Sequence, residues 1–196
     1  MGCPEAPENL DPGRIRNALN GMCAPSIAVT DCLEAPAGWH ARFSARSRLY
    51  VYALLESDIP DPFLARTTHR RPARLDLDAL NEAAGHLVGE HDFSSFGRVP
   101  DPDASAVRTL YELRAVRSGS LVQIRARANA FIQQMVRSLV GTLVEVGEGR
   151  RSPDSVPLVL DARDRAAAGP VAPPQGLCLM AVEYDEGWSR PVDPHE

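Results

Sequence analysis

The order of secondary-structure signals after residue 44 is the feature that most limits what this chain can fold into. Hydrophobic periodicity and turn residues predict a strand, a helix, two strands, a second helix and a final strand. The predicted ranges are 45–55, 76–88, 108–116, 121–129, 131–146 and 177–184. This β-α-β-β-α-β order is the split βαβ, or ferredoxin-like, arrangement, in which two helices cover a mixed sheet. We therefore predict an α+β fold.

The first 44 residues give weaker signals. Asp11 followed by Pro12 is typical of a helix start, because aspartate caps the free N–H groups and proline fits the first helical turn. Residues 26–33 are mostly small and apolar, and we expect a strand there that extends the sheet. Residues 60–72, rich in proline and arginine, are expected to form a long loop.

Composition excludes several classes of protein. The chain has no apolar run long enough to cross a membrane and no apparent signal peptide, so we expect a cytoplasmic protein without a membrane partner. Its four cysteines are scattered, and no Cys-x-x-Cys or histidine pair completes a metal site. Neither a Walker A motif nor a dinucleotide-binding glycine motif is present. These absences argue against a metal or nucleotide cofactor.

The net charge of −5 argues against a nucleic-acid partner, but the charge is unevenly distributed. All the basic residues are arginines, and residues 42–74 contain seven of them against three acidic residues. A locally basic face can bind phosphate groups on a chain whose total charge is negative. We therefore keep a polyanion partner open.

Two predicted strands carry polar faces. Residues 45–55 place Arg46, Arg48, Tyr50 and Tyr52 on one side. Residues 121–129 likewise place Gln123, Arg125, Arg127 and Asn129 on one side. Arginine can bind phosphate and tyrosine can stack on a base, so both faces are candidates for RNA binding. The alternative is an ordinary solvent-exposed sheet face.

Arg137 and the pair His91-Asp92 are further candidates. Arg137 lies among apolar residues of the predicted helix 131–146. Such an arginine either pairs with a carboxylate, here that of an active-site acid, or extends its head to solvent at the helix edge. His91 and Asp92 could form a dyad, but neighbouring residues rarely orient each other, and the loop is better explained as fixing itself or touching a ligand.

Five segments together resemble one family. Its motifs are F-H-A-R-F-S-A, R-x-Y-x-Y, G-x-H-D-F-S-S-F, M-V-R-x-(I/L)-V-G and A-P-x-x-G-L. The chain matches them, in the same order, at residues 39–45 (WHARFSA), 48–52 (RLYVY), 89–96 (GEHDFSSF), 135–141 (MVRSLVG) and 172–177 (APPQGL). The chain is thus similar to the TruA-type tRNA pseudouridine synthases, from about Leu10 to Tyr184.

The resemblance implies an isomerase that needs neither cofactor nor metal. Members detach uracil from its ribose, rotate it and reattach it through carbon. They act as homodimers on uridines at positions 38 to 40 of the tRNA anticodon arm, and the target base is flipped into a cleft between two ferredoxin-like halves.

The resemblance also implies roles for individual residues. Tyr50 would stack near the target base, Arg137 would pair with the catalytic aspartate, and Leu177 would form the apolar wall of the base pocket. Substrate contacts, or shaping of the RNA site, are expected from the following residues: His40, Arg42, Arg46, Arg48, His91, Asp92, Phe93, Ser94, Ser95 and Phe96.

One family motif, R-T-D-x-G-V-H-A with the nucleophilic aspartate, does not occur in the 196 residues. None of Asp31, Asp92 and Asp164 has matching neighbours. We therefore expect a pseudouridine synthase fold with an incomplete N-terminal half. Residues 1–44 would be the remnant of the catalytic half, residues 45–188 the C-terminal half, and residues 189–196 a disordered tail.

The chain as written is expected to be inactive, and three explanations are open. The gene start is placed too late or the gene is truncated; or the chain is a non-catalytic RNA-binding relative; or it is a ferredoxin-like module that binds a protein through an open sheet edge.

Overall fold

The computed structural model describes residues 11–99 and 104–185, so the predicted tail at 189–196 lies outside the described residues. The chain divides into two compact units between residues 43 and 44. None of the helices in the described part of the chain combines the length and apolar character that crossing a bilayer requires.

The first unit contains the predicted helix but not the predicted strand. Helix α1 (Pro12–Cys23) begins at Asp11, whose side chain accepts a hydrogen bond from the N–H of Gly13 at 3.0 Å. Residues 27–36 have no regular secondary structure, so the strand expected at 26–33 is wrong. The physical reason is the side chain of Asn20, which bonds both the N–H and the C=O of Val29, at 2.7 and 3.0 Å. Those groups are therefore not available for a strand ladder.

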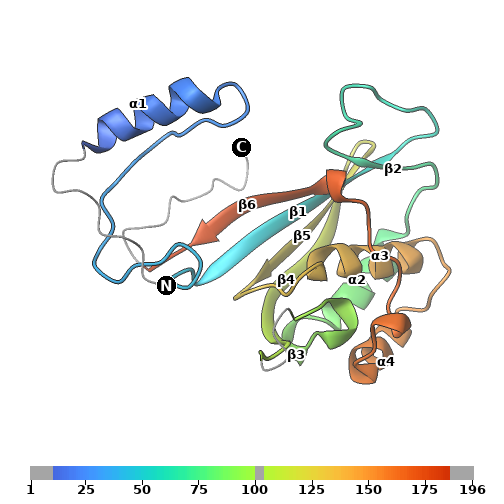
Figure 1. Ribbon diagram of the computed structural model, residues 1–196. Helices are drawn as coiled ribbons and strands as arrows, with labels where there is room; N and C mark the ends of the chain where they lie inside the picture. Colours follow the sequence, from blue (N-terminus) through green and yellow to red (C-terminus); the bar gives the residue numbers. More distant parts are fainter. Residues whose placement is uncertain (1–10, 100–103, 186–196) are drawn as a thin grey trace. The chain divides into compact units, whose positions relative to one another are not determined.

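The second unit is built on one mixed sheet (Figure 1). Its strands are β1 (Ser47–Glu56), β2 (His69–Arg71), β3 (Gly89–Asp92), β4 (Val107–Ser118), β5 (Leu121–Ala128) and β6 (Leu177–Glu183). The order across the sheet is β2-β1-β5-β4-β3, and β6 also pairs with β1, antiparallel. Strands β6, β1, β5 and β4 thus lie in the ferredoxin-like order, and the predicted α+β fold is confirmed. The short strands β2 and β3 are additions that the sequence did not predict.

Helices α2 (Leu77–Gly85), α3 (Met135–Gly147) and α4 (Ser155–Ala162) accompany the sheet, and α2 and α3 cover one of its faces (Figure 1). Most of α3 is buried, as its apolar stripe predicts. The structure shortens two predicted helices. Helix α2 ends four residues before Gly89, which begins β3, and α3 begins four residues after Phe131, because Gln134 adopts a left-handed backbone conformation.

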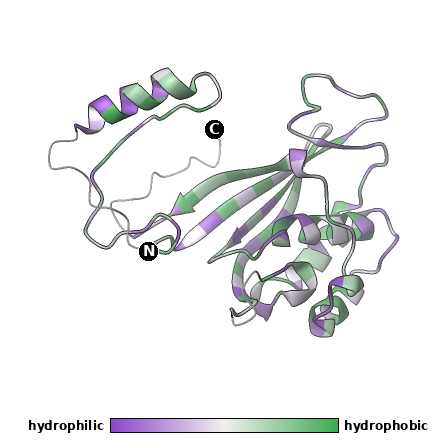
Figure 2. Cartoon of the chain, viewed as in Figure 1, coloured by the Kyte–Doolittle hydropathy of each residue, from purple (hydrophilic) through white to green (hydrophobic). Residues whose placement is uncertain are grey.

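The two polar strand faces do not combine into one RNA-binding surface. Along β4 and β5 hydrophilic and hydrophobic residues alternate, as Figure 2 shows. Cross-strand partners share a face, and Tyr50 of β1 pairs with the fully buried Ala126 of β5, whereas Arg127 pairs with Leu49. The tyrosines of β1 therefore face the helices, and the arginines of β5 face the other side. Tyr52 is fully buried, so a solvated face is wrong for it.

Candidate active site

A pocket of about 170 Å³ opens in the second unit, between the middle of β1, the chain that leads into α3 and the first residue of β6. Two of the lining residues belong to strands, three precede α3 and three form its first turn. They are, in this order, Tyr50 and Leu177; Phe131, Ile132 and Gln134; and Met135, Val136 and Arg137. Three polar groups, a phenol, a carboxamide and a guanidinium, thus meet in an otherwise apolar hollow. This combination is typical of a small-ligand site.

Tyr50 reaches the pocket because β1 alternates. It lies on the helix-covered face and is half-buried between its two sheet neighbours, Ala126 on β5 and Leu179 on β6. Its ring meets that of Phe131 edge-on, with 5.2 Å between centroids and an interplanar angle of 88°. This edge-to-face contact holds the ring in one orientation at the pocket wall.

Arg137, the third residue of α3, is tied to the chain that leads into β6. Its Nε donates a hydrogen bond to the carbonyl oxygen of Ala172 at 2.5 Å. Within the described ranges, the terminal nitrogens of its guanidinium group make no hydrogen bond or ion pair. The side chain is half-buried rather than buried, so part of its charge is solvated. Arg137 therefore offers free donors to a carboxylate or another acceptor in the pocket.

Leu177 is placed by close packing of the turn before it. A Cβ on Gly176 would lie 2.7 Å from the carbonyl oxygen of Ala53 and 2.7 Å from the ring of Tyr52, so only glycine lets the turn rest on β1. The Tyr52 hydroxyl donates to the carbonyl oxygen of Pro173 at 2.7 Å and ties the same turn down. Burial raises the pKa of this phenol to about 12, partly offset by the positive charge of Arg137.

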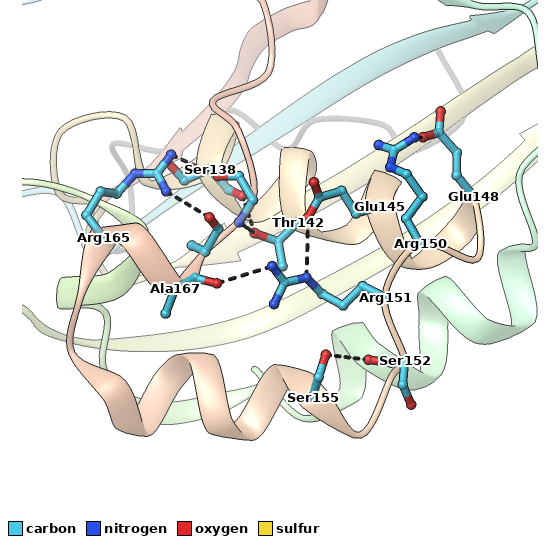
Figure 3. A network of polar contacts seen from close by, with 12 residues as sticks. Ser138, Thr142, Glu145, Glu148, Arg150, Arg151, Ser152, Ser155, Arg165 and Ala167 are labelled. Carbon is cyan, nitrogen blue, oxygen red and sulfur yellow. Dashed lines mark hydrogen bonds and ion pairs between the residues drawn. The ribbon is translucent and has the colours of Figure 1, made fainter.

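A polar network fixes the second half of α3, beyond the turn that carries Arg137 (Figure 3). The Thr142 hydroxyl accepts a hydrogen bond from the backbone N–H of Gly169 at 2.9 Å. Arg151 bridges Glu145 of α3, at 3.3 Å, and the carbonyl oxygen of Ala167, at 3.2 Å. These bonds hold residues 165–170 against α3, so the helix that carries Arg137 is anchored along its length.

The segment 91–96 does not line the pocket. Phe93, Ser95 and Phe96 have no exposed surface, and the Ser95 hydroxyl accepts a hydrogen bond from the N–H of Asp164 at 2.9 Å. In this structure these three side chains can shape the site but cannot touch RNA. His91 bonds the carbonyl oxygen of Val88 at 3.2 Å, so it does not form a dyad with its neighbour.

Asp92 is occupied by structural contacts. Its carboxylate accepts hydrogen bonds from the hydroxyl and the N–H of Ser94, at 2.5 and 2.9 Å, and lies 3.4 Å from Arg163. The Ser94 hydroxyl is the largest cause that lowers the pKa of this carboxyl, and the charge of Arg163 adds to it. Neither Asp92 nor Asp164 lines the pocket, so neither supplies a carboxylate to Arg137.

The remaining predicted residues lie away from the pocket or in the other unit. His40 and Arg42 belong to the first unit, where the His40 Nδ1 accepts a hydrogen bond from the N–H of Arg42 at 3.1 Å. Arg46 is exposed and forms a bidentate ion pair with Asp185, both distances being 2.7 Å. Arg48 donates to the carbonyl oxygen of Asn129 at 2.6 Å and so serves the fold.

The sequence reasoning missed five lining residues, at positions 131, 132 and 134–136. Three of them directly precede Arg137, so adjacency to a candidate residue at a helix start was a usable signal. Phe131 and Ile132 fell within the predicted helix 131–146, and that assignment hid their place at the pocket.

Comparison with known proteins identifies the family of the chain. A family profile described as tRNA pseudouridine synthase matches residues 83–185. The tRNA pseudouridine synthase A of Sinorhizobium fredii (strain NBRC 101917 / NGR234) is 43% identical over 173 residues, which cover 87% of this chain and 70% of that protein. The enzyme of the same name from Rhodopseudomonas palustris (strain BisA53) is 42% identical over 182 residues, 92% of this chain and 74% of that protein.

A third relative, the tRNA pseudouridine synthase A of Xanthomonas oryzae pv. oryzae (strain PXO99A), is 45% identical over 172 residues, 86% of this chain and 66% of that protein. The profile covers more than half of the chain, and the first two relatives are matched over more than two thirds of their length. The chain therefore belongs to the TruA-type tRNA pseudouridine synthases, a family of isomerases that convert uridine to pseudouridine in tRNA.

Proposed function

We propose that this chain receives a uridine of the tRNA anticodon arm, at positions 38 to 40, in the pocket beside α3. The observation that carries the proposal is that Tyr50, Arg137 and Leu177 line the same pocket although they lie far apart in the sequence. A flipped base needs an aromatic surface, an apolar wall and a few polar groups at its edge, and the pocket offers all three.

In this proposal each side chain has one task. The ring of Tyr50, held edge-on by Phe131, stacks near the uracil. Arg137, whose Nε is engaged by Ala172, directs its free terminal nitrogens at the carboxylate of a nucleophilic aspartate. Leu177 closes the apolar side. During the isomerisation the bond between the ribose C1′ and N1 breaks, the base turns, C1′ bonds C5, and the C5 proton is lost while N1 gains one.

The RNA backbone needs positive charge outside the pocket. We assign phosphate contacts to His40, Arg42 and Arg46, whose side chains are exposed. Arg46 would exchange its solvent-exposed ion pair with Asp185 for a phosphate, an exchange that the partly buried bonds of Arg48 do not allow. Arg48 and residues 91–96 are assigned a shaping role, since Arg48 bonds backbone carbonyls and much of the segment is buried. Residues 1–44 would belong to the catalytic half and residues 45–188 to the C-terminal half, in a homodimer.

We further propose that these 196 residues do not turn over substrate by themselves. The nucleophile motif R-T-D-x-G-V-H-A is absent from them, and no carboxylate of a described residue lies in the pocket. Without a nucleophile at C1′, the glycosidic bond of uridine has no group to displace it.

The test is a turnover assay in two arms. Unmodified tRNA is incubated with the 196-residue chain, and with the same chain extended by a segment that carries the aspartate motif; pseudouridine is then scored at positions 38 to 40. We expect no product in the first arm and product in the second. Product from the 196 residues alone would refute the proposal of inactivity, and product at other positions would refute the anticodon-arm assignment.

Binding and assembly are measured in parallel. The 196-residue chain should bind tRNA with an affinity that falls as salt rises, because arginine–phosphate contacts release counterions. Sedimentation should give twice the mass of one chain. A monomer at all concentrations would contradict the homodimer.

A second candidate function is binding of a protein partner at β6. In the described ranges β6 pairs only with β1, and Leu179 and Met180 on it are exposed. An open apolar strand edge can accept a strand from another chain. Absence of tRNA affinity, with loss of a protein contact when the strand is blocked by Leu179→Pro, would favour this function over the first.

A further inference from the structure

Gln134 adopts a backbone conformation that side chains normally avoid. Its φ is 65° and its ψ is 3°, in the left-handed region, directly before the first residue of α3. Among the described residues, four others with positive φ are glycines, and besides Gln134 only Arg163 carries a side chain there. A Cβ in this region crowds the following carbonyl, so a residue other than glycine calls for a reason.

The contacts of Arg163 explain why a residue with a side chain stands at its left-handed position, whereas the contacts of Gln134 do not. Arg163 forms an ion pair with Asp92 at 3.4 Å and follows the last residue of α4. The carboxamide of Gln134 makes no hydrogen bond to any described residue and does not cap α3. It is exposed and lines the pocket beside Tyr50 and Arg137. The donor and the acceptor of the Gln134 carboxamide are therefore available to a ligand rather than used by the fold.

The backbone around Gln134 is held from both sides. Gln133 exchanges two hydrogen bonds with Arg98, each 3.1 Å long. Gly97 allows this approach, because a Cβ there would lie 2.6 Å from the side chain of Ile132. On the other side the N–H of Ser138 donates to the carbonyl oxygen of Gln134 at 3.0 Å. The backbone from which the Gln134 side chain extends is thus held in place at the pocket.

We propose that Gln134 is a specificity-determining residue that pairs its carboxamide with the N3–H and O4 of the target uracil. This inference rests on the proposed function. The positive end of α3 favours the carboxamide oxygen on the helix side and leaves the NH₂ group pointing away. Held in that sense, the oxygen accepts from N3–H and the NH₂ donates to O4. Cytosine offers an acceptor at N3 and a donor at N4, so it needs the carboxamide reversed.

The experiment compares two anticodon stem-loop RNAs that differ at one base. Among positions 38 to 40, the first RNA has uridine at position 39 only. The second RNA has cytidine at position 39 and is otherwise identical. The full 196-residue chain is titrated with each by fluorescence anisotropy. We expect about tenfold tighter binding of the uridine RNA, the size of one well-placed bidentate contact. In Gln134→Ala and Gln134→Gly the ratio should fall to about one.

Two further variants separate recognition from folding. Gln134→Glu should shift the preference toward the cytidine RNA, because a carboxylate accepts from the N4 amino group of cytosine. Arg163→Gly is the matched control. Glycine relieves a left-handed backbone in both Gln134→Gly and Arg163→Gly. Gln134→Gly should raise Tm by about 2–4 °C, and Arg163→Gly should raise it by less, because that variant also loses the ion pair with Asp92. Only Gln134→Gly should change the ratio.

The outcomes are distinguishable. A wild-type ratio of one, or a ratio that persists in the Ala, Gly and Glu variants, overturns the role of Gln134 while RNA binding stands. If neither RNA binds the wild-type chain even at low salt, the proposed function itself fails and the inference falls with it. Loss of the ratio in Arg163→Gly as well would mean that general loosening, not the carboxamide, is responsible.

Discussion

Arg137 and Ala172 are joined by two hydrogen bonds that run in opposite directions. The Nε of Arg137 donates to the carbonyl oxygen of Ala172 at 2.5 Å, and the N–H of Ala172 donates to the carbonyl oxygen of Arg137 at 3.0 Å. The helix that carries the arginine and the chain that leads to Leu177 are therefore one rigid part of the pocket. A change in the packing of either segment should therefore displace both Arg137 and Leu177 in the pocket.

Gly141 provides a direct test of that packing. A Cβ at this position would lie 1.7 Å from the carbonyl oxygen of Pro170, a backbone atom that cannot turn away. Gly141→Ala should lower the free energy of unfolding by at least about 2 kcal/mol, measured by urea denaturation. Gly85→Ala in α2 is the control, since no atom lies within 4 Å of its Cβ, and it should be neutral or stabilising by about 0.5 kcal/mol. Equal effects would contradict the observed contact of α3 with residue 170.

The aromatic surface of Tyr50 should matter for RNA binding more than its hydroxyl. Tyr50→Ala removes the surface and should weaken binding of the uridine stem-loop by about 5- to 100-fold, the range found for base stacking. Tyr50→Phe keeps the ring and its contact with Phe131, so its affinity should stay near wild type. Tyr111→Ala, at an exposed position of β4, is the control. If Tyr111→Ala weakens binding as much as Tyr50→Ala, the pocket is not the base site.

Tyr52 should ionise late and make stability sensitive to alkali. Burial raises the pKa of its phenol from 10.0 to about 12, so the folded state favours the neutral form. The stability this provides is complete below pH 10 and is lost as the pH rises toward 12, by on the order of 2 kcal/mol. Ultraviolet titration should resolve one late-ionising tyrosine that Tyr52→Phe removes. Retention of that late step in Tyr52→Phe would show that another group is responsible.

Tyr52→Phe should also lower the free energy of unfolding at neutral pH, by about 1–2 kcal/mol, because the carbonyl oxygen of Pro173 loses its hydrogen-bond donor. Urea denaturation at pH 7 measures this loss. An unchanged midpoint would mean that water replaces the hydroxyl and that the turn before Leu177 is not held by Tyr52.

Glu56 should contribute to acid sensitivity. Burial opposes its ionisation, but two hydrogen bonds from Arg117, at 2.8 and 2.9 Å, and one from the N–H of Leu75, at 2.8 Å, outweigh it and lower its pKa. A lowered folded-state pKa gives stability that is present above the unfolded value of 4.5 and is lost as the pH falls through the folded value.

The measurement for this carboxylate is urea denaturation at pH 7 and pH 3. Glu56→Gln should lose about 1–3 kcal/mol at pH 7 and should show a smaller difference between the two pH values than wild type. Glu90→Gln, at an exposed position of β3, is the control and should behave as wild type. A pH dependence unchanged in Glu56→Gln would place the acid-sensitive group elsewhere.

Local patterns predicted most of the second unit. Residues 121–128 form a strand because their apolar side chains recur at every second position and a Ser-Gly turn precedes them. Residues 135–147 form a helix because their apolar side chains form a stripe. The strand expected at 26–33 does not form, because the side chain of Asn20 bonds the backbone of Val29. A local hydrophobic pattern contains no information on such a contact between separate segments.

The pocket was predictable only in part. Tyr50 and Arg137 were candidates from strand alternation and helix position, and the motif resemblance added Leu177. Their roles stay predictions, although the fold brings the three to one hollow. Gln134 was missed, because a left-handed backbone and an unused carboxamide leave no periodic signal. Asp92 shows the converse: a residue that looked chemical in the sequence is used by Ser94 and Arg163.

By itself, the sequence determined the β-α-β-β-α-β order after residue 44, the family, and the absence of the aspartate motif from these 196 residues, because each depends only on which residues follow one another. The tertiary structure alone decided which face of each strand meets the helices and which polar side chains stay free. Register decided the first, since Tyr50 pairs with Ala126 and thereby lies on the covered side. Hydrogen bonds between distant segments decided the second, since a donor already bonded within the fold, such as Arg48, is no longer free for RNA.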